Sequence, residues 1–225
     1  MSSAAVAEHL AEVRARIADA ARASGRRSGD ITLVVVTKGV EPDRIRAAVD
    51  AGAHDLGENR AQELLAKAPA LAGVEPVPRW HFIGRLQRNK VRSVAPYVAL
   101  WQSVDREELA AEIGRRAPGA TVLVQVNVAG EAQKGGCPPA DAPGLVEACR
   151  RHGCAVDGLM TVPPARSDPR AVFDEVRELV ERLGLPVCSM GMSGDYELAI
   201  AHGATMVRVG SAIFGPRREP PAARR

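Results

Sequence analysis

The chain has 225 residues, of which 46% are hydrophobic and 25% are charged, and its formal net charge is +3. This composition is typical of a globular domain and gives no sign of the strongly basic surface of a nucleic-acid-binding protein. No apolar run approaches the ~20 residues that span a bilayer. Glu8, Glu12, Arg14 and Arg16 also interrupt the segment where a signal peptide would be apolar. We therefore expect a soluble, cytoplasmic protein with no nucleic-acid or membrane partner.

The predicted elements alternate between amphipathic helices and short apolar strands. Apolar residues from Val6 to Ala21 recur every three or four positions, which predicts an opening helix. Residues 31–37 form a β-branched run without polar alternation, as expected of a strand buried on both faces. Seven more strands are predicted near residues 53–56, 80–83, 98–102, 121–128, 155–160, 186–189 and 205–209. Helices are predicted at 42–50, 58–68, 87–95, 105–116 (capped by Asp105), up to 152, 169–183 and 193–201 (starting at Ser193).

Eight strands that alternate with helices predict an α/β fold, a single (β/α)₈ TIM barrel. The competing architecture is an open doubly wound sheet, which normally carries a glycine-rich nucleotide-binding turn after its first strand. Residues 37–42 are not such a turn. No helix is predicted after the last strand, so we expect the opening helix to complete the outer ring. Residues 1–216 would form one domain, and residues 217–225 a flexible tail.

The four cysteines give no sign of a metal site or a disulfide framework. Cys137, Cys149, Cys154 and Cys188 show no C-x-x-C spacing and have no histidine beside them in a zinc pattern. A chain of this length builds its own core and does not need disulfides. We therefore predict reduced thiols and no bound metal.

Of the four lysines, one has a position that suggests chemistry. Lys67 and Lys90 lie in predicted helices among polar neighbours, where we expect them to be solvated, and Lys134 lies in a glycine-rich loop. Lys38 directly follows the first buried strand, at the end of the barrel where active sites of this fold lie. Partial burial there would lower the pKa of the amine and favour its attack on an aldehyde. The alternative is a lysine that extends from the barrel rim into water.

Small residues after the last two strands suggest a site for a phosphate group. Ser193 and Gly194 follow strand seven, and Gly210 and Ser211 follow strand eight. Such residues let backbone N–H groups approach an anion closely, although serine is also a common helix cap. Closure of the barrel places strand eight beside strand one, so this cradle would lie next to Lys38. The arrangement would accept an aldehyde that carries a phosphate.

Four other residues are candidates for the same site. Arg208 lies near the end of strand eight and needs an acceptor, which is either a carboxylate inside the barrel or a ring nitrogen of a cofactor. Asn59 and His81 follow strands two and three, and Met192 precedes the proposed cradle. For a single histidine or methionine, a structural role is the competing explanation.

Taken together, these residues resemble the pyridoxal phosphate homeostasis proteins, which are similar to the barrel domain of alanine racemase, a fold type III pyridoxal 5'-phosphate (PLP) fold. The matching motifs are T-K at 37–38, G-E-N at 57–59, Q-E at 62–63, W-H-F-I-G-R-L-Q-R-N-K at 80–90, V-N at 127, E-A-Q-K-G-G at 131–136, G-L-M-T-V-P at 158–163, S-M-G-M-S-G-D at 189–195 and M-V-R-V-G-S-A-I-F-G at 206–215. Arg60 and Ala61 depart from the bulkier pair expected after G-E-N.

The resemblance implies that PLP is held as a Schiff base on Lys38, with its phosphate at Ser193, Gly210 and Ser211. Arg208 would face the pyridine nitrogen, and Asn59 and His81 would flank the ring. Members of the family look like binders that store, buffer or deliver the cofactor, without established enzymatic turnover. For this chain we expect a monomer or weak dimer, with PLP-dependent apoenzymes as partners. As a separate hypothesis, Lys134, on a loop that should face the same mouth, would assist cofactor transfer.

Two enzymatic alternatives remain open at this stage. A PLP-dependent amino-acid racemase or lyase would use the same lysine but needs further proton-transfer groups, and racemisation needs one on each face of the substrate carbon. Tyr196 would have to reach the mouth of the barrel to supply one. A Schiff-base aldolase acting on phosphosugars would use Lys38 and the phosphate loops without PLP.

Overall fold

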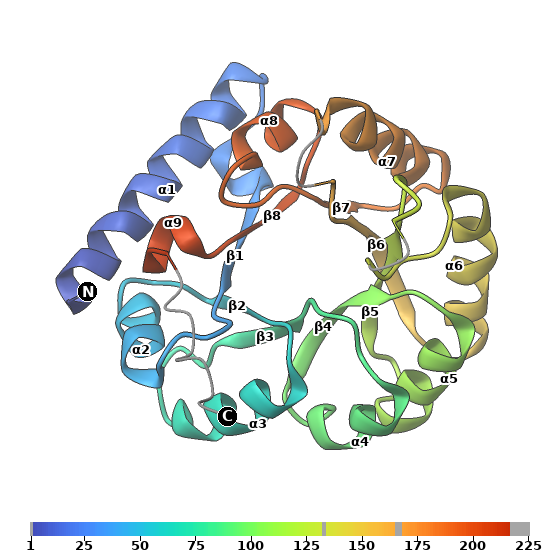
Figure 1. Cartoon of the computed structure of the whole chain (residues 1–225), viewed down its shortest axis with the longest axis horizontal. Helices are drawn as coiled ribbons and strands as arrows, with labels where there is room; N and C mark the ends of the chain where they lie inside the picture. The colour runs from blue at the N-terminus through green and yellow to red at the C-terminus, as the bar shows by residue number, and fades with distance from the viewer. Residues whose placement is uncertain (1, 132–133, 165–167, 217–225) are drawn as a thin grey trace, which may run out of the picture.

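The eight predicted strands close into a barrel. The computed structural model describes residues 2–131, 134–164 and 168–216 of the chain. All strand pairs are parallel and follow chain order, and β8 pairs with β1 to complete the ring (Figure 1). The strands are β1 (Thr32–Val36), β2 (Asp55–Glu58), β3 (Arg79–Phe82), β4 (Val98–Val104), β5 (Thr121–Val126), β6 (Ala155–Thr161), β7 (Val187–Ser189) and β8 (Met206–Val209).

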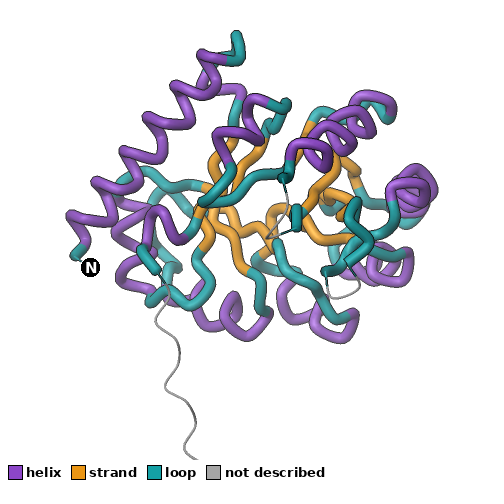
Figure 2. Tube along the Cα trace, turned by 45° about the horizontal axis from the view of Figure 1, so that its top comes forward, coloured by secondary structure: helices purple, strands orange, loops and turns teal. Residues whose placement is uncertain are grey.

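The helices surround this barrel and bury its outer face (Figure 2). The α-helices are α1 (Ser3–Ala23), α2 (Pro42–Asp50), α3 (Ala61–Ala70), α4 (Val91–Val94), α5 (Glu107–Arg116), α6 (Ala142–Arg151), α7 (Arg170–Arg182), α8 (Tyr196–Ala201) and α9 (Ser211–Phe214). Short 3₁₀ helices cover Ser28–Asp30, Arg88–Lys90 and Pro139–Asp141. The predicted (β/α)₈ barrel is confirmed.

Helix α1 fills the place in the outer ring that the sequence assigned to it. Its apolar stripe, from Val6 to Ala21, is buried, and the helix packs against α2, α8 and α9 (Figure 1). The prediction that no helix follows the last strand is wrong, because the one-turn helix α9 begins directly after β8. The predicted flexible tail, residues 217–225, lies outside the described residues.

Side chains alternate between the barrel interior and the helix layer, as the two-residue period of a strand requires. On β1, Val34 packs in the interior cluster with Leu123 and Met160, whereas Val35 belongs to the larger cluster that contains the helix faces. Continuing the alternation places Lys38 on the interior side and Thr37 on the helix side. Backbone register therefore decides which residues reach the interior.

Three predicted element boundaries are corrected by the structure. Strand β2 begins and ends two residues later than predicted, so Glu58 is its last residue rather than the first residue of a helix. Helix α5 is capped at Arg106 and not by Asp105, which pairs with the Arg106 guanidinium. Helix α8 begins at Tyr196, which leaves Ser193 in the preceding turn.

The four cysteines are free and buried, as expected of reduced thiols. Burial raises the pKa of Cys137 to about 11, and it raises the pKa values of Cys149 and Cys188 to about 12. These thiols are protonated at neutral pH and therefore weak nucleophiles. Within the described ranges, no cluster of three or more His, Cys, Asp or Glu side chains is arranged to hold a metal ion. No helix in that part of the chain has both the length and the apolar character needed to cross a bilayer.

Candidate functional site

A cavity of about 420 Å³ opens at the carboxyl ends of the strands. It contains eight of the nine residues predicted to bind the cofactor; the exception is His81. Those eight are Lys38, Asn59, Met192, Ser193, Gly194, Arg208, Gly210 and Ser211, and the other lining residues are Val36, Val40, Ile83, Gly84, Val162, Phe214 and Gly215. Barrel closure brings together residues separated by more than 150 positions, because β8 pairs with β1.

Lys38 enters the cavity from the loop that follows β1. Its side chain is partly buried and lines the cavity together with Val36, two residues earlier on the same side of the strand. The intervening residue, Thr37, is fully buried on the helix side, where its hydroxyl donates to Oε1 of Glu58 at 2.8 Å. The hydrogen bond to Glu58 holds the Thr37 side chain on the helix side. The next side chain, that of Lys38, therefore points to the barrel interior.

A buried cluster around Lys67 holds the backbone on both sides of Lys38. The Lys67 ammonium donates to the Thr37 carbonyl at 2.7 Å and lies 2.5 Å from Oε1 of Glu58 and 2.7 Å from Oε2 of Glu63. The same Glu63 oxygen accepts from the Gly39 N–H at 2.6 Å. The residues before and after Lys38 are thus tied to one charged cluster.

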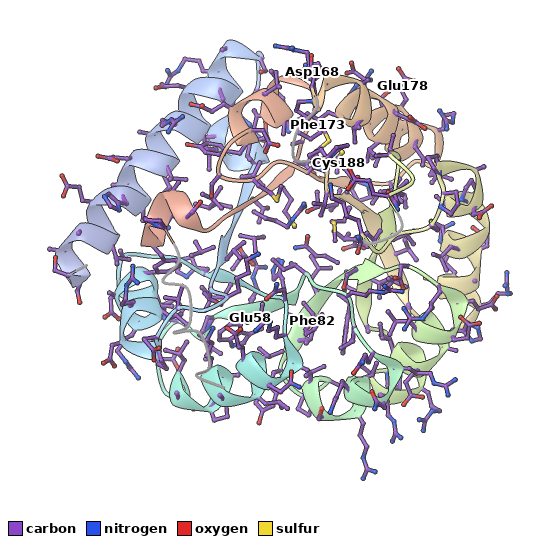
Figure 3. The ribbon with its side chains drawn as sticks, in the orientation of Figure 1. Glu58, Phe82, Asp168, Phe173, Glu178 and Cys188 are labelled. Atoms are coloured by element: carbon purple, nitrogen blue, oxygen red, sulfur yellow. The ribbon has the colours of Figure 1, made fainter. Side chains whose placement is uncertain are left out.

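The prediction that Lys67 is solvated is therefore wrong, since its side chain is 8% exposed. Figure 3 shows its partner Glu58 beside Phe82, in agreement with their register on neighbouring strands. Burial raises the pKa of Glu58, and hydrogen bonds from Lys67 and Thr37 offset only part of that effect. The sequence contained one sign that Lys67 is paired. Glu63 and Lys67 are four residues apart, which places both side chains on one helix face.

The loops after β7 and β8 form a cradle of backbone N–H groups. Oγ of Ser193 accepts from the N–H groups of Gly210 at 3.1 Å and Ala212 at 3.4 Å, which joins the two loops. The N–H groups of Ser193, Gly194 and Ser211 have no acceptor among the described residues. A Cβ on Gly210 would lie 3.1 Å from the Val36 carbonyl oxygen, so glycine permits this close approach to β1. The cradle fits an anion.

Arg208 lies at the inner wall of the cavity and is 4% exposed. Its Nη1 donates to Oγ of Ser189 and its Nη2 to the carbonyl of Thr161, each at 2.6 Å. No carboxylate within the described ranges forms an ion pair with it, which removes the first of the two explanations offered from the sequence. Burial lowers the pKa of Arg208 to about 10, so the guanidinium is charged at neutral pH.

His81 lies below the cavity instead of beside it. It is the third residue of β3, is 4% exposed, and does not line the cavity. Its Nε2 lies 2.9 Å from Oδ1 of Asp55 and its Nδ1 lies 2.8 Å from Nε2 of Gln102. The structure thus gives no support to the prediction that His81 flanks a ring in the cavity; it makes His81 part of the polar layer beneath.

Asn59 is held at the edge of the cavity by the end of β2. Its N–H lies 3.1 Å from Oε2 of Glu58, and its backbone packs so tightly against Gly84 that a Cβ there would lie 2.2 Å from the Asn59 carbonyl oxygen. Its side-chain oxygen is buried without a hydrogen-bond partner among the described residues. An unsatisfied polar atom at a cavity wall fits a site that binds a polar ligand.

Four other residues do not line the cavity: Lys134, Tyr196, Met160 and Met190. The Lys134 ammonium lies 2.8 Å from the Pro163 carbonyl and 3.0 Å from Oε2 of Glu131. Tyr196 is buried beneath the Arg16 guanidinium of α1, 5.4 Å from the ring centroid, and does not reach the mouth. Met160 and Met190, on and beside the strands that precede the cavity, are fully buried core residues.

The residues present fit PLP. Lys38 would supply a primary amine for a Schiff base, the cradle would supply N–H donors for a phosphate, and Arg208 would supply a donor to a ring nitrogen. When bound, PLP stabilises negative charge on a carbon attached to its imine. An arginine partner donates and does not protonate the ring nitrogen, which weakens that property.

The chain is similar to proteins of known family. Residues 9–218 match the family model described as alanine racemase, N-terminal domain. It is 43% identical over 222 residues to the pyridoxal phosphate homeostasis protein of Pseudomonas aeruginosa, covering 94% of this chain and 96% of that one. It is 42% identical to the protein of the same name from Aquifex aeolicus, with 94% and 98% covered.

Among solved structures, the barrel resembles PipY of Synechococcus elongatus with PLP bound. The sequences are 31% identical, the TM-score is 0.80, and the match covers 93% of this chain and all of that chain. The structure of PipY without PLP gives a TM-score of 0.84 at 32% identity. With 43% identity over nearly the whole chain to a protein of this name, the chain belongs to the pyridoxal phosphate homeostasis protein family, within the alanine racemase N-terminal domain family.

Proposed function

We propose that this protein holds PLP as a Schiff base on Lys38 and takes part in PLP homeostasis by storing, buffering or delivering the cofactor. The observation that carries the proposal is the shared cavity: Lys38 lies in the same 420 Å³ space as the N–H cradle and the Arg208 guanidinium. The relatives named for PLP homeostasis and the PLP-bound PipY support it. We further propose that the protein acts in the cytoplasm as a monomer or weak dimer.

The same cavity gives less support to a racemase or lyase. Racemisation needs a proton-transfer group on each face of the substrate carbon. Among the described lining residues, Lys38 is the one side chain with ordinary proton-transfer chemistry, and no His, Tyr, Cys, Asp or Glu lines the cavity. Holding the cofactor needs only the amine and the cradle.

The experiment is an absorption spectrum followed by borohydride reduction. Purified protein loaded with PLP should show an absorption band above about 400 nm, which is typical of a PLP Schiff base. Reduction should attach the pyridoxyl group to the peptide containing Lys38. Lys38→Ala should lose both signals, whereas the control variant Arg92→Ala, at an exposed cation outside the cavity, should keep them. Attachment to another lysine, or an unchanged spectrum in Lys38→Ala, would overturn the proposal. A protein that binds no PLP but cleaves phosphosugars would favour the aldolase instead.

We also propose that the protein transfers PLP to PLP-dependent apoenzymes. Lys134 lies on the loop after β5, and its ammonium contacts the carbonyl of Pro163, next to the cavity residue Val162. We propose that this amine competes for the aldehyde during transfer. Lys134→Ala should then slow PLP release to an acceptor apoenzyme without changing the Lys38 spectrum. Release at the unchanged rate would remove this role and leave the Lys38 assignment intact.

A further inference from the structure

A second cavity, of about 530 Å³, adjoins the cofactor cavity at Asn59, which lines both. It is formed by the segments after β2, β3 and β4. Besides Asn59, its lining residues are Arg60, Ala61, Gln62, Phe82, Arg85, Leu86, Gln87, Lys90 and Arg106. Most of these belong to the G-E-N and W-H-F-I-G-R-L-Q-R-N-K motifs, which binding of PLP at Lys38 does not explain.

The charge of this cavity has one sign. Among the described residues that line it, all four charged side chains are cationic: Arg60, Arg85, Lys90 and Arg106. Arg106 pairs with Asp105, and Arg60 lies 4.0 Å from Glu63. Arg85 and Lys90 form no ion pair with any carboxylate in the described ranges. Like charges held around one concave space create a potential that attracts anions.

The cavity also has the composition expected of a site for a small organic anion. Pockets for small ligands are apolar concave spaces with a few polar groups that orient the ligand. Here Phe82 and Leu86 are buried at the cavity wall, and Gln62 and Gln87 offer neutral hydrogen-bonding groups. Arginine and lysine together suit a phosphate, because guanidinium groups bind its oxygens in pairs and an ammonium adds a point charge.

We propose that this second cavity binds the phosphate monoester of a small organic molecule, with Arg85 and Lys90 as the residues that hold the phosphate. The site is separate from Lys38 and needs no Schiff base. The proposal does not depend on PLP binding at Lys38, because it rests on the second cavity alone. An occupant there would lie beside Asn59 and therefore next to the cofactor.

The test uses protein whose Lys38 site has been filled with PLP and reduced by borohydride, so that only a second site remains. Calorimetric titration with pyridoxine 5'-phosphate, which has no aldehyde, should show binding at low ionic strength. Inorganic phosphate should compete with it, and pyridoxine, which lacks the phosphate, should not bind at the same concentrations. If inorganic phosphate binds as tightly as the ester, the site takes free phosphate, and the ester class is overturned.

The double variant R85Q/K90Q should weaken binding by about tenfold or more, since two charge-assisted contacts are lost. The matched control is R88Q/R92Q, which removes two exposed cations from the same segment but outside the cavity. Its affinity should stay within about twofold of the parent, because distant exposed charges are screened. Equal losses in both variants, or no binding to the parent, would overturn the proposal.

Repeating the titration on Lys38→Ala separates this site from the proposed function. Binding of pyridoxine 5'-phosphate that survives in that variant and disappears with R85Q/K90Q supports the second site, even if the Lys38 spectrum fails to appear. Binding that disappears in Lys38→Ala alone would assign the ligand to the cofactor cavity and overturn the second site.

Discussion

Arg208 is connected to Asp55 across the barrel interior by four hydrogen bonds. Arg208 donates to Oγ of Ser189 at 2.6 Å, and Ser189 donates to Oε1 of Gln102 at 2.7 Å. Nε2 of Gln102 then lies 2.8 Å from Nδ1 of His81, whose Nε2 lies 2.9 Å from Asp55. Because Nε2 of Gln102 can only donate, His81 accepts at Nδ1 and donates at Nε2. Every donor points from the cavity toward Asp55. This series of four hydrogen bonds therefore fixes the orientation of the Arg208 guanidinium.

Ser189→Ala should weaken PLP binding, because Nη1 of Arg208 loses its acceptor and the guanidinium becomes free to turn. We expect about tenfold lower affinity, the scale of one hydrogen bond to a charged group, and a shifted absorption band of bound PLP. Both are measured by spectrophotometric titration. Ser189→Thr keeps the hydroxyl and should restore the band. If both variants lose affinity while the band stays unchanged, Ser189 acts only in packing and not in positioning Arg208.

Stability should fall in acid through Asp55. Burial alone would raise the pKa of Asp55, but hydrogen bonds from His81 and Arg79 outweigh it and hold the pKa below its ordinary value. A carboxyl whose folded pKa is depressed stabilises the protein above its unfolded pKa, and this contribution is lost as pH falls through the folded pKa.

The check on Asp55 is urea unfolding at neutral and acid pH. Asp55→Asn should be less stable than the parent at neutral pH, and the difference should shrink below about pH 4, the ordinary pKa of aspartate. Asp50→Asn, at an exposed carboxyl at the end of α2, is the matched control. A difference that does not change with pH would contradict the role assigned to the Asp55 charge.

Lys67→Met should destabilise the protein by about 3–5 kcal/mol, because it leaves Glu58 buried without its cation. The side chains of Lys67 and Glu58 are 8% and 0% exposed, so solvent cannot replace the lost partner. Denaturant unfolding measures the cost. Glu58→Gln combined with Lys67→Met should cost less than the sum of the two single changes. Additive costs would show that the pair is not coupled.

Gly84→Ala should destabilise the fold and disturb the cavity edge. The new Cβ would lie 2.2 Å from the Asn59 carbonyl oxygen, so the backbone of one segment must move. Overpacking of this kind costs about 1–3 kcal/mol. Gly144→Ala is the control, since a Cβ in that position of α6 meets nothing within 4 Å. It should stabilise the helix by about 0.5–1 kcal/mol. Thermal unfolding measures the stability of both variants. Equal changes in stability would contradict the close contact between Gly84 and Asn59.

The sequence predicted the barrel because local patterns carry that information. Buried strands show as β-branched runs, and each is followed by a helix with apolar spacing of three or four. Chain order then specifies that strand eight meets strand one. From that single step follow the cavity, the position of Lys38 and its proximity to Gly210 and Ser211, all of which the structure contains.

The pairing of buried polar groups was decided only by the tertiary structure. Lys67 looked like a solvated helix residue, and His81 looked like a cavity residue, because Glu58 and Asp55, which pair with them, lie on a neighbouring strand whose register decides the contact. An error of two residues at the end of β2 was enough to hide Glu58, because residue 58 was then assigned to a helix and the alternation of the strand was not continued to it. Periodicity in a sequence identifies a face of an element. Three-dimensional packing decides what that face meets.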